Sequence, residues 1–105
     1  MHVDKDSITG LISEKLRILA PQAKAILFGS RARGNPGPDS DWDILVLLDK
    51  EKIDSTDFDE IAYPLFELGW SLNQQFSVKL YTINEWRKRS FTPFYKNVEQ
   101  EGVLL

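Results

Sequence analysis

Two apolar runs, separated by a stretch that can form neither helix nor strand, place the strongest limit on how this chain folds. AKAILF (residues 23–28) and WDILVLLD (42–49) have the length and continuous apolar character of buried strands. The intervening NPGPDS holds two prolines and a glycine in six residues, so no regular element can continue through it. The sequence therefore predicts two strands joined by an irregular loop.

Periodic apolar residues predict helices before and after these strands. Apolar side chains recur every three or four positions over 8–19, with Asp6 or Ser7 available as the helix N-cap. The same spacing returns over 58–72, where Pro64 should kink the helix because its ring removes a backbone donor.

The remaining segments complete an α/β (α+β) fold. SVKLYTI (77–83) is a third apolar strand, INEWRKRS (83–90) a short helix, and Thr92-Pro93 a cap that opens a last helix ending at Gly102. We expect a small mixed sheet of three or more strands flanked by helices. With 105 residues, 42% of them hydrophobic, residues 1–105 are predicted to form a single domain.

Composition excludes several function classes. No apolar run approaches the roughly 20 residues that span a bilayer. The amino terminus lacks the pattern of a secretory signal and the chain has no cysteine, so we expect a cytoplasmic protein with no membrane contact. The net charge of -3 disfavours strong nucleic-acid binding, and the single histidine argues against histidine-based metal sites.

A glycine and a serine directly follow the first predicted strand. Gly29 lets the backbone turn sharply and approach a ligand, since no side chain intervenes. If Ser30 begins a helical turn, its hydroxyl and the nearby free amides can hold a phosphate oxygen. A simple turn without a ligand is the alternative for these two residues alone.

Two aspartates open the second predicted strand. Asp41 and Asp43 are two residues apart, so on a strand both carboxylates project from the same face. Two such charges repel each other unless a cation lies between them, and oxygen ligands of this kind suit Mg²⁺ or Mn²⁺. Alternatively they are solvated aspartates at a strand entrance, with Asp39 and Ser40 making the turn.

Taken together, GSRARG and SDWD resemble the signature of the DNA polymerase beta superfamily of nucleotidyltransferases, in particular its minimal members. The fixed positions of that signature are all present, as Gly29, Ser30, Ala32, Gly34, Ser40, Asp41 and Asp43. The resemblance implies a polymerase-beta-like fold and the Mg²⁺-dependent transfer of a nucleoside monophosphate from a triphosphate, with ATP as first choice, to a hydroxyl acceptor. It also implies that Asp41 and Asp43 are the catalytic metal ligands.

The same resemblance implies which residues bind the nucleotide. Gly29, Ser30 and Ser40 belong to the implied triphosphate site, with Ser30 on the β or γ phosphate. Arg31 and Arg33 lie between them in sequence, where a guanidinium could neutralise triphosphate charge. The alternative for both arginines is a solvated loop cation that pairs with Asp39.

One position departs from the family pattern. Active relatives carry a third carboxylate, commonly as Val-Asp-Leu, on the strand that corresponds to SVKLYTI, whereas this chain has Val78, Lys79 and Leu80. An ammonium at that place could pair with Asp43 and partly replace a metal ion. The alternative is a strand lysine that extends to solvent.

The resemblance also implies a protein partner. Small family members often occur beside a helical partner encoded nearby, in toxin–antitoxin pairs. Residues 58–72 and 91–104 carry more large apolar side chains than a small sheet can cover, which predicts an interface, while a homo-oligomer stays open. The second hypothesis is therefore a catalytically weakened module that binds a nucleotide or a partner.

Overall fold

The computed structural model describes residues 5–34, 36–37 and 40–105, with side chains described from Ser7 onward. Four strands form one mixed sheet in the order β3-β2-β1-β4, in which β1 runs antiparallel to β2 and β4, and β2 runs parallel to β3. In chain order the elements are α1 (Lys5–Leu19), β1 (Lys24–Phe28), α2 (Ser30–Arg33), β2 (Trp42–Leu48), α3 (Ser55–Asp57), the π-helix η1 (Phe58–Ala62), α4 (Tyr63–Ser71), β3 (Phe76–Thr82), α5 (Ile83–Lys88), α6 (Pro93–Glu101) and β4 (Val103–Leu104).

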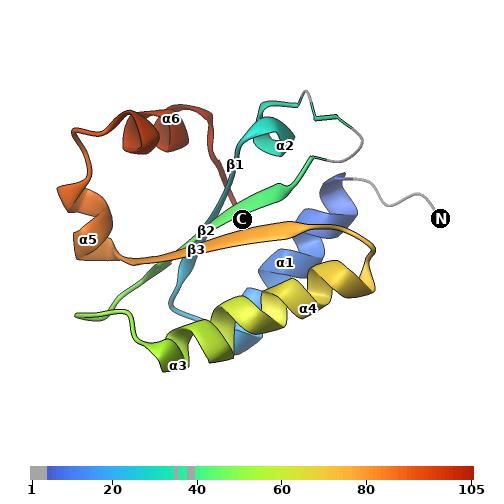
Figure 1. The fold of residues 1–105 in the computed structure, drawn as a ribbon, viewed down its shortest axis with the longest axis horizontal. Coiled ribbons are helices and arrows are strands. Elements are labelled where there is room, and N and C mark those ends of the chain that lie inside the picture. Colours follow the sequence, from blue (N-terminus) through green and yellow to red (C-terminus); the bar gives the residue numbers. More distant parts are fainter. Residues whose placement is uncertain (1–4, 35, 38–39) are drawn as a thin grey trace.

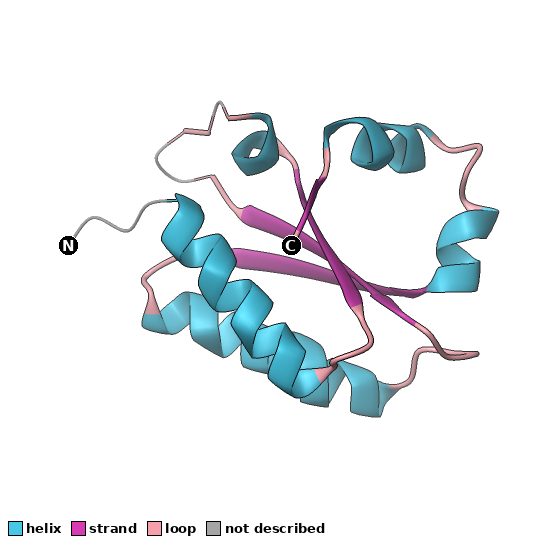
Figure 2. Ribbon diagram, turned by 180° about the vertical axis from the view of Figure 1, so that it is seen from behind, coloured by secondary structure: helices cyan, strands magenta, loops and turns pink. Residues whose placement is uncertain are grey.

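Helices pack against both faces of the sheet and bury more side chains on one face than on the other (Figure 1). Helix α1 and the continuous helix α3–η1–α4 pack on the first face, as the reverse view also shows (Figure 2). The core on this side contains Ile8, Ile12, Leu16, Leu27, Trp42, Ile44, Val46, Leu48, Ile61 and Leu65. On the second face α5 and α6 enclose a smaller cluster of Leu45, Leu47, Trp86 and Val98.

Strand alternation decides which residues of β2 face each layer. Trp42 and Ile44 are buried against α1 and α4, so Asp43 and Leu45 project to the second face. Helices α5 and α6 cover that face around Leu45 and Leu47, and Asp43, nearer the start of the strand, is only partly buried. The second face therefore presents a carboxylate at the end that the helices leave open.

The predicted fold class is confirmed, with differences at the element ends. Helix α1 already includes Asp6 and Ser7, so the prediction that either residue caps it was wrong. The disturbance predicted at Pro64 takes the form of a π-helical turn, in which the Tyr63 N–H donates to the Phe58 carbonyl. The wider turn lies directly before the proline, where a regular helix would crowd its ring. The short strand β4 was not predicted.

The prediction of an irregular loop for NPGPDS lies partly outside the described residues, because Asn35, Pro38 and Asp39 fall there. Pro36, Gly37 and Ser40 belong to no helix or strand, as predicted. None of the helices in the described ranges combines the length and the hydropathy needed to span a bilayer.

Candidate active site

Gly29 joins β1 to the short helix α2 and comes into direct contact with Asp43. Its φ is 77°, in the left-handed region that side chains disfavour. A Cβ placed on Gly29 would overlap the Asp43 carboxylate. The β1–β2 register explains the proximity, because Phe28 at the end of β1 pairs with Asp43 at the start of β2. Only glycine allows the backbone to approach the carboxylate so closely.

Ser30 begins α2 at the edge of this contact. The Gly29 carbonyl accepts hydrogen bonds from the Ala32 and Arg33 amides, both at 3.1 Å, so the helical turn closes immediately after the glycine. Within the part of the chain that the structure describes, the partly buried Ser30 hydroxyl has no hydrogen-bond partner. It is available to a ligand beside Asp43.

The environment of Asp43 raises the pKa of its carboxyl group. Burial is the largest cause, and repulsion from the Asp41 carboxylate is the second. The positive charges of Lys79 and Arg33 lower the pKa and offset part of the rise. Burial and the Asp41 charge together outweigh the two cations, so the charged form of Asp43 is disfavoured.

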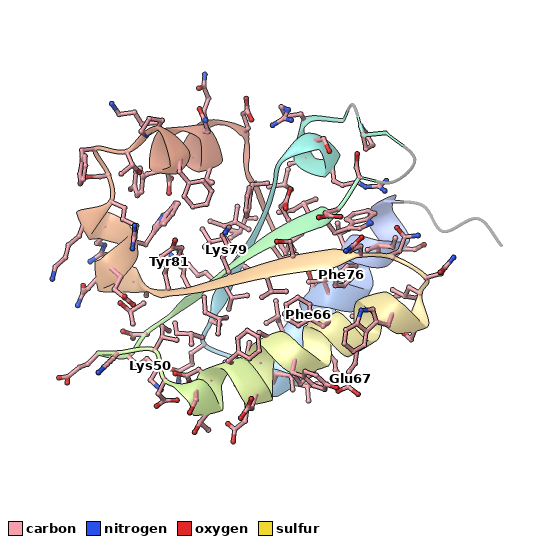
Figure 3. The ribbon with its side chains drawn as sticks, viewed as in Figure 1. Lys50, Phe66, Glu67, Phe76, Lys79 and Tyr81 are labelled. Carbon is pink, nitrogen blue, oxygen red and sulfur yellow. The ribbon has the colours of Figure 1, made fainter. Side chains whose placement is uncertain are left out.

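Strand β3 places Lys79 on the same face as Asp43. Parallel pairing sets Ser77 opposite Asp43 and Lys79 opposite Leu45, whose side chain belongs to the second-face cluster. Figure 3 shows Lys79 and Tyr81 on the side of β3 that faces α5 and α6. Among the described residues no group of three or more His, Cys, Asp or Glu side chains could hold a metal ion, so the pair of aspartates has no third carboxylate beside it.

The two arginines that lie between the fixed signature positions make different contacts. Arg31 donates from its guanidinium to the Ser40 carbonyl at 2.9 and 3.3 Å and lies 4.7 Å from the centre of the Trp42 ring. Arg33 forms a 3.3 Å ion pair with Glu101 of α6. The alternative pairing of either arginine with Asp39 lies outside the described residues.

Ser40 is held within its own loop. Its hydroxyl accepts a hydrogen bond of 2.8 Å from the Gly37 amide, while its carbonyl receives Arg31. Arg31 therefore links α2 to the end of the loop at Ser40, the residue directly before Asp41. The structure thus brings Gly29, Asp41, Asp43 and Lys79 together and gives Arg31 and Ser40 supporting contacts.

A small cavity of about 140 Å³ lies between Gly29 and α6. Its lining combines apolar residues, the Asn97 amide and the Arg33–Glu101 ion pair, and comprises Phe28, Gly29, Arg33, Phe94, Asn97, Val98 and Glu101. Sequence reasoning missed this contribution of α6, since Glu101 is 68 residues from Arg33 and no local pattern connects them. Two larger hollows, of about 370 and 310 Å³, contain none of the predicted site residues.

The comparisons with known proteins agree with this geometry. A family model described as a nucleotidyltransferase domain matches residues 11–105. A solved structure described as a minimal nucleotidyltransferase matches with a TM-score of 0.68 and 24% identity, over 99% of this chain and 98% of that chain. This likeness confirms the predicted polymerase-beta-like fold.

Two further solved structures are toxin–antitoxin proteins. A chain from a variant of the MntA–HpeT toxin–antitoxin has a TM-score of 0.60 and 25% identity, over 99% of this chain and 72% of that chain. A toxin–antitoxin with AMP-PNP has a TM-score of 0.60 and 26% identity, over 90% of this chain and 69% of that chain. The search of curated proteins finds no match. On the strength of the family match, which spans the sheet and the candidate site, the chain belongs to the nucleotidyltransferase domain family.

Proposed function

We propose that this protein is a Mg²⁺-dependent nucleotidyltransferase that moves a nucleoside monophosphate from ATP to a hydroxyl acceptor on a partner protein in the cytoplasm. The observation that carries the proposal is the contact between the Gly29 backbone and Asp43, beside Asp41, at the open end of the sheet. The AMP-PNP and toxin–antitoxin structures support the choice of triphosphate and of a protein partner.

The residues present fit a divalent cation. Asp41 and Asp43 offer carboxylate oxygens, and burial together with repulsion from Asp41 raises the pKa of Asp43, an environment in which a bound cation would favour the carboxylate. These two residues would hold Mg²⁺ or Mn²⁺. The bound ion would supply charge neutralisation and polarisation of the reacting phosphate.

Different residues of the chain would bind different parts of the nucleotide. We assign the Ser30 hydroxyl to the distal phosphates as a hydrogen-bond donor, with Gly29 allowing the close approach of the backbone. Arg33, whose charge reaches Asp43, can neutralise the triphosphate if it leaves Glu101. Arg31 and Ser40 position the loop that carries Asp41.

Lys79 limits the reaction in this proposal. A protonated amine cannot accept the proton that the acceptor hydroxyl loses, and its charge opposes a second divalent ion beside Asp43. General-base help of this kind typically contributes about 10²- to 10⁴-fold. We therefore expect slow transfer.

Transfer from ATP labelled at the α-phosphate, with Mg²⁺ and the protein encoded nearby as acceptor, tests the proposal. We expect Lys79→Asp to raise the rate of label transfer at least tenfold over the unsubstituted protein, with Lys24→Asp, an exposed lysine of β1, as the control. The enzyme proposal would be contradicted if neither the unsubstituted protein nor Lys79→Asp transferred label while Lys79→Asp bound Mg²⁺ more tightly.

A binding module is the second candidate, and the lysine at the position of the third acid favours it. Such a module would keep the triphosphate site formed around Ser30 and Asp43 and would act only by binding its partner. It predicts triphosphate binding without transfer, even in Lys79→Asp.

A further inference from the structure

Four neighbouring aromatic side chains lie along the helix α3–η1–α4, three of them exposed and the fourth, Phe66, partly buried against the core. We call Phe58, Tyr63, Phe66 and Trp70 the aromatic stripe. Ring centroids lie 6.0 Å apart for Phe58 and Phe66, 6.4 Å for Phe66 and Trp70, and 5.9 Å for Tyr63 and Trp70. Phe58 and Tyr63 are each 47% exposed and Trp70 is 62% exposed. Large aromatic rings gathered in this way are typical of protein interfaces.

The same helix is acidic along the stripe. Between Ser55 and Leu72 the chain has four carboxylates and no lysine or arginine. Asp57 is paired with Lys50 at 2.8 Å. The other three, Asp59, Glu60 and Glu67, are exposed and make no ion pair with the described residues. Each is adjacent in sequence to a member of the stripe or lies within three positions of one, on the same helix.

The negative charge of these carboxylates limits which kind of partner can bind the aromatic stripe. A second copy of the chain would bring the same three carboxylates against the stripe, and like charges at close range repel each other. Phosphate groups of nucleic acids or anionic lipids would be repelled in the same way. A partner surface that is both apolar and basic matches the aromatic rings and the carboxylates together.

We infer that the aromatic stripe binds a basic amphipathic helix of a partner protein, with apolar side chains on the rings and lysine or arginine on the flanking acids. From Phe58 to Trp70 the helix rises about 18 Å, which a partner helix of about 12 residues would match. This inference deepens the partner-binding part of the proposed function and rests on it.

The stripe lies on the opposite side of the sheet from the candidate active site. Helix α4 packs on the face that contains Ile44 and Val46, whereas Asp43 and Lys79 project to the other face. Figure 3 shows Phe66 on the side of β3 away from Lys79, and Glu67 on the outer side of α4. A helix bound to the stripe would leave the site around Ser30 and Asp43 accessible to a triphosphate.

The test uses two synthetic 14-residue helical peptides with identical leucine faces and either lysine or glutamate on the polar face. Trp42 and Trp86 are buried, so a shift of tryptophan emission on titration reports Trp70. We expect the lysine peptide to bind at least tenfold more tightly than the glutamate peptide, with emission moving to shorter wavelength. Equal binding of the two peptides, or binding of neither, would overturn the inference.

Variants separate the stripe from general attraction to an acidic protein. We expect the double variant Asp59→Lys/Glu67→Lys to reverse the preference between the labelled peptides, measured by anisotropy. The double variant Glu14→Lys/Glu51→Lys changes the net charge by the same amount, at exposed acids outside the helix α3–η1–α4. It should still prefer the lysine peptide. A preference that both variants lose to the same extent would overturn the inference.

Two further measurements examine other occupants and the active site. Sedimentation equilibrium showing self-association that Tyr63→Ser abolishes, or an emission shift of Trp70 with zwitterionic lipid vesicles, would each overturn the assignment of the occupant. The same samples are titrated with Mg²⁺ and AMP-PNP. If the protein binds the triphosphate but does not prefer the lysine peptide, only the assignment of the aromatic stripe is refuted. If it prefers the lysine peptide but does not bind the triphosphate, only the catalytic part of the proposed function is refuted.

Discussion

Asp43 has the most demanding environment of the candidate site residues. Its carboxylate lies against the Gly29 backbone, is partly withdrawn from water and is close to Asp41. A carboxylate held in this way is destabilised as an anion, and a bound cation would reverse the effect. The local cost to the fold is consistent with a site built for a ligand rather than for stability.

The raised pKa of Asp43 makes a stability prediction. Because its pKa is higher in the folded state than the unfolded value of about 3.9, its contribution to the free energy of unfolding is greatest when it is protonated. That contribution is lost as the pH rises through the unfolded pKa and then the folded pKa. We expect metal-free Asp43→Asn to melt at a higher temperature than the unsubstituted protein at pH 7.

The difference in melting temperature between Asp43→Asn and the unsubstituted protein should shrink as the pH falls toward the unfolded pKa of the aspartate. At that pH both Asp43 and the substituted asparagine are neutral. Asp41→Asn removes only the repulsion and should give a smaller increase at pH 7. Thermal melts across this pH range decide the point. A melting temperature for Asp43→Asn at or below that of the unsubstituted protein at pH 7 would refute the assigned environment.

Ser30 makes the second prediction at the scale of a residue. If its hydroxyl donates only to the distal phosphates, Ser30→Ala should weaken triphosphate binding about tenfold, as expected for one hydrogen bond to a charged group. Monophosphate binding should hardly change. Calorimetric titrations with both nucleotides measure the two losses, and equal losses would count against this position of the triphosphate.

At the scale of elements, helix caps and strand registers position the site. Thr82 ends β3 and caps α5 through a capping box, in which its hydroxyl accepts from the Glu85 amide and the Glu85 carboxylate accepts from the Thr82 amide, both at 3.0 Å. Helix α5 thereby packs Trp86 into the second-face cluster. That cluster forms one border of the surface that Lys79 occupies.

We expect Thr82→Ala to lower the free energy of unfolding by about 1–2 kcal/mol, at the upper end of the range for lost caps because Thr82 is buried. Thr92→Ala is the matched control. Thr92 is only partly buried, and its hydroxyl accepts from the Tyr95 amide at 3.2 Å and donates to the Arg89 carbonyl at 2.7 Å. Because water can replace these partners more readily than those of the buried Thr82, the loss of Thr92 should cost less. Urea unfolding of both variants measures the difference, and an equal or larger cost for Thr92→Ala would contradict this account of α5.

Sequence patterns predicted the elements that local chemistry specifies. The apolar runs predicted β1 and β2 to within a residue, and Thr92-Pro93 predicted the start of α6. Strand β4 was missed because two residues carry no periodicity, and its position depends on pairing with Ile26 and Leu27. The π-helical turn was missed because apolar spacing does not distinguish it from an α-helix.

In the candidate site, too, the residues set by local sequence could be predicted, and the contacts that depend on tertiary structure could not. Gly29, Ser30, Asp41 and Asp43 stand out in the sequence because their spacing follows from a strand, a turn and a strand. That Lys79 shares the face of Asp43 depends on the β2–β3 register, which the sequence alone does not fix. Contacts such as Arg33 with Glu101 arise only when α6 folds back over β1.

At the scale of the whole molecule, the sheet separates the two surfaces to which we assign functions. The candidate site residues lie at one end of one face, and the aromatic stripe lies on the helix α3–η1–α4, which packs against the other face. This arrangement allows a partner and a triphosphate to bind at once. A partner that supplies the acceptor hydroxyl must then extend around the edge of the sheet to reach Asp43.

The most direct test of the central claim is a calorimetric titration of AMP-PNP with Mg²⁺ into the protein and three variants. We predict one triphosphate per chain and at least a tenfold loss of affinity in Asp41→Asn and in Asp43→Asn, a cost of about 1.4 kcal/mol or more. Asp49→Asn, an exposed acid directly after β2, should bind as the unsubstituted protein does. Equal affinity in all four proteins, or no binding by any of them, would contradict the assignment of this site.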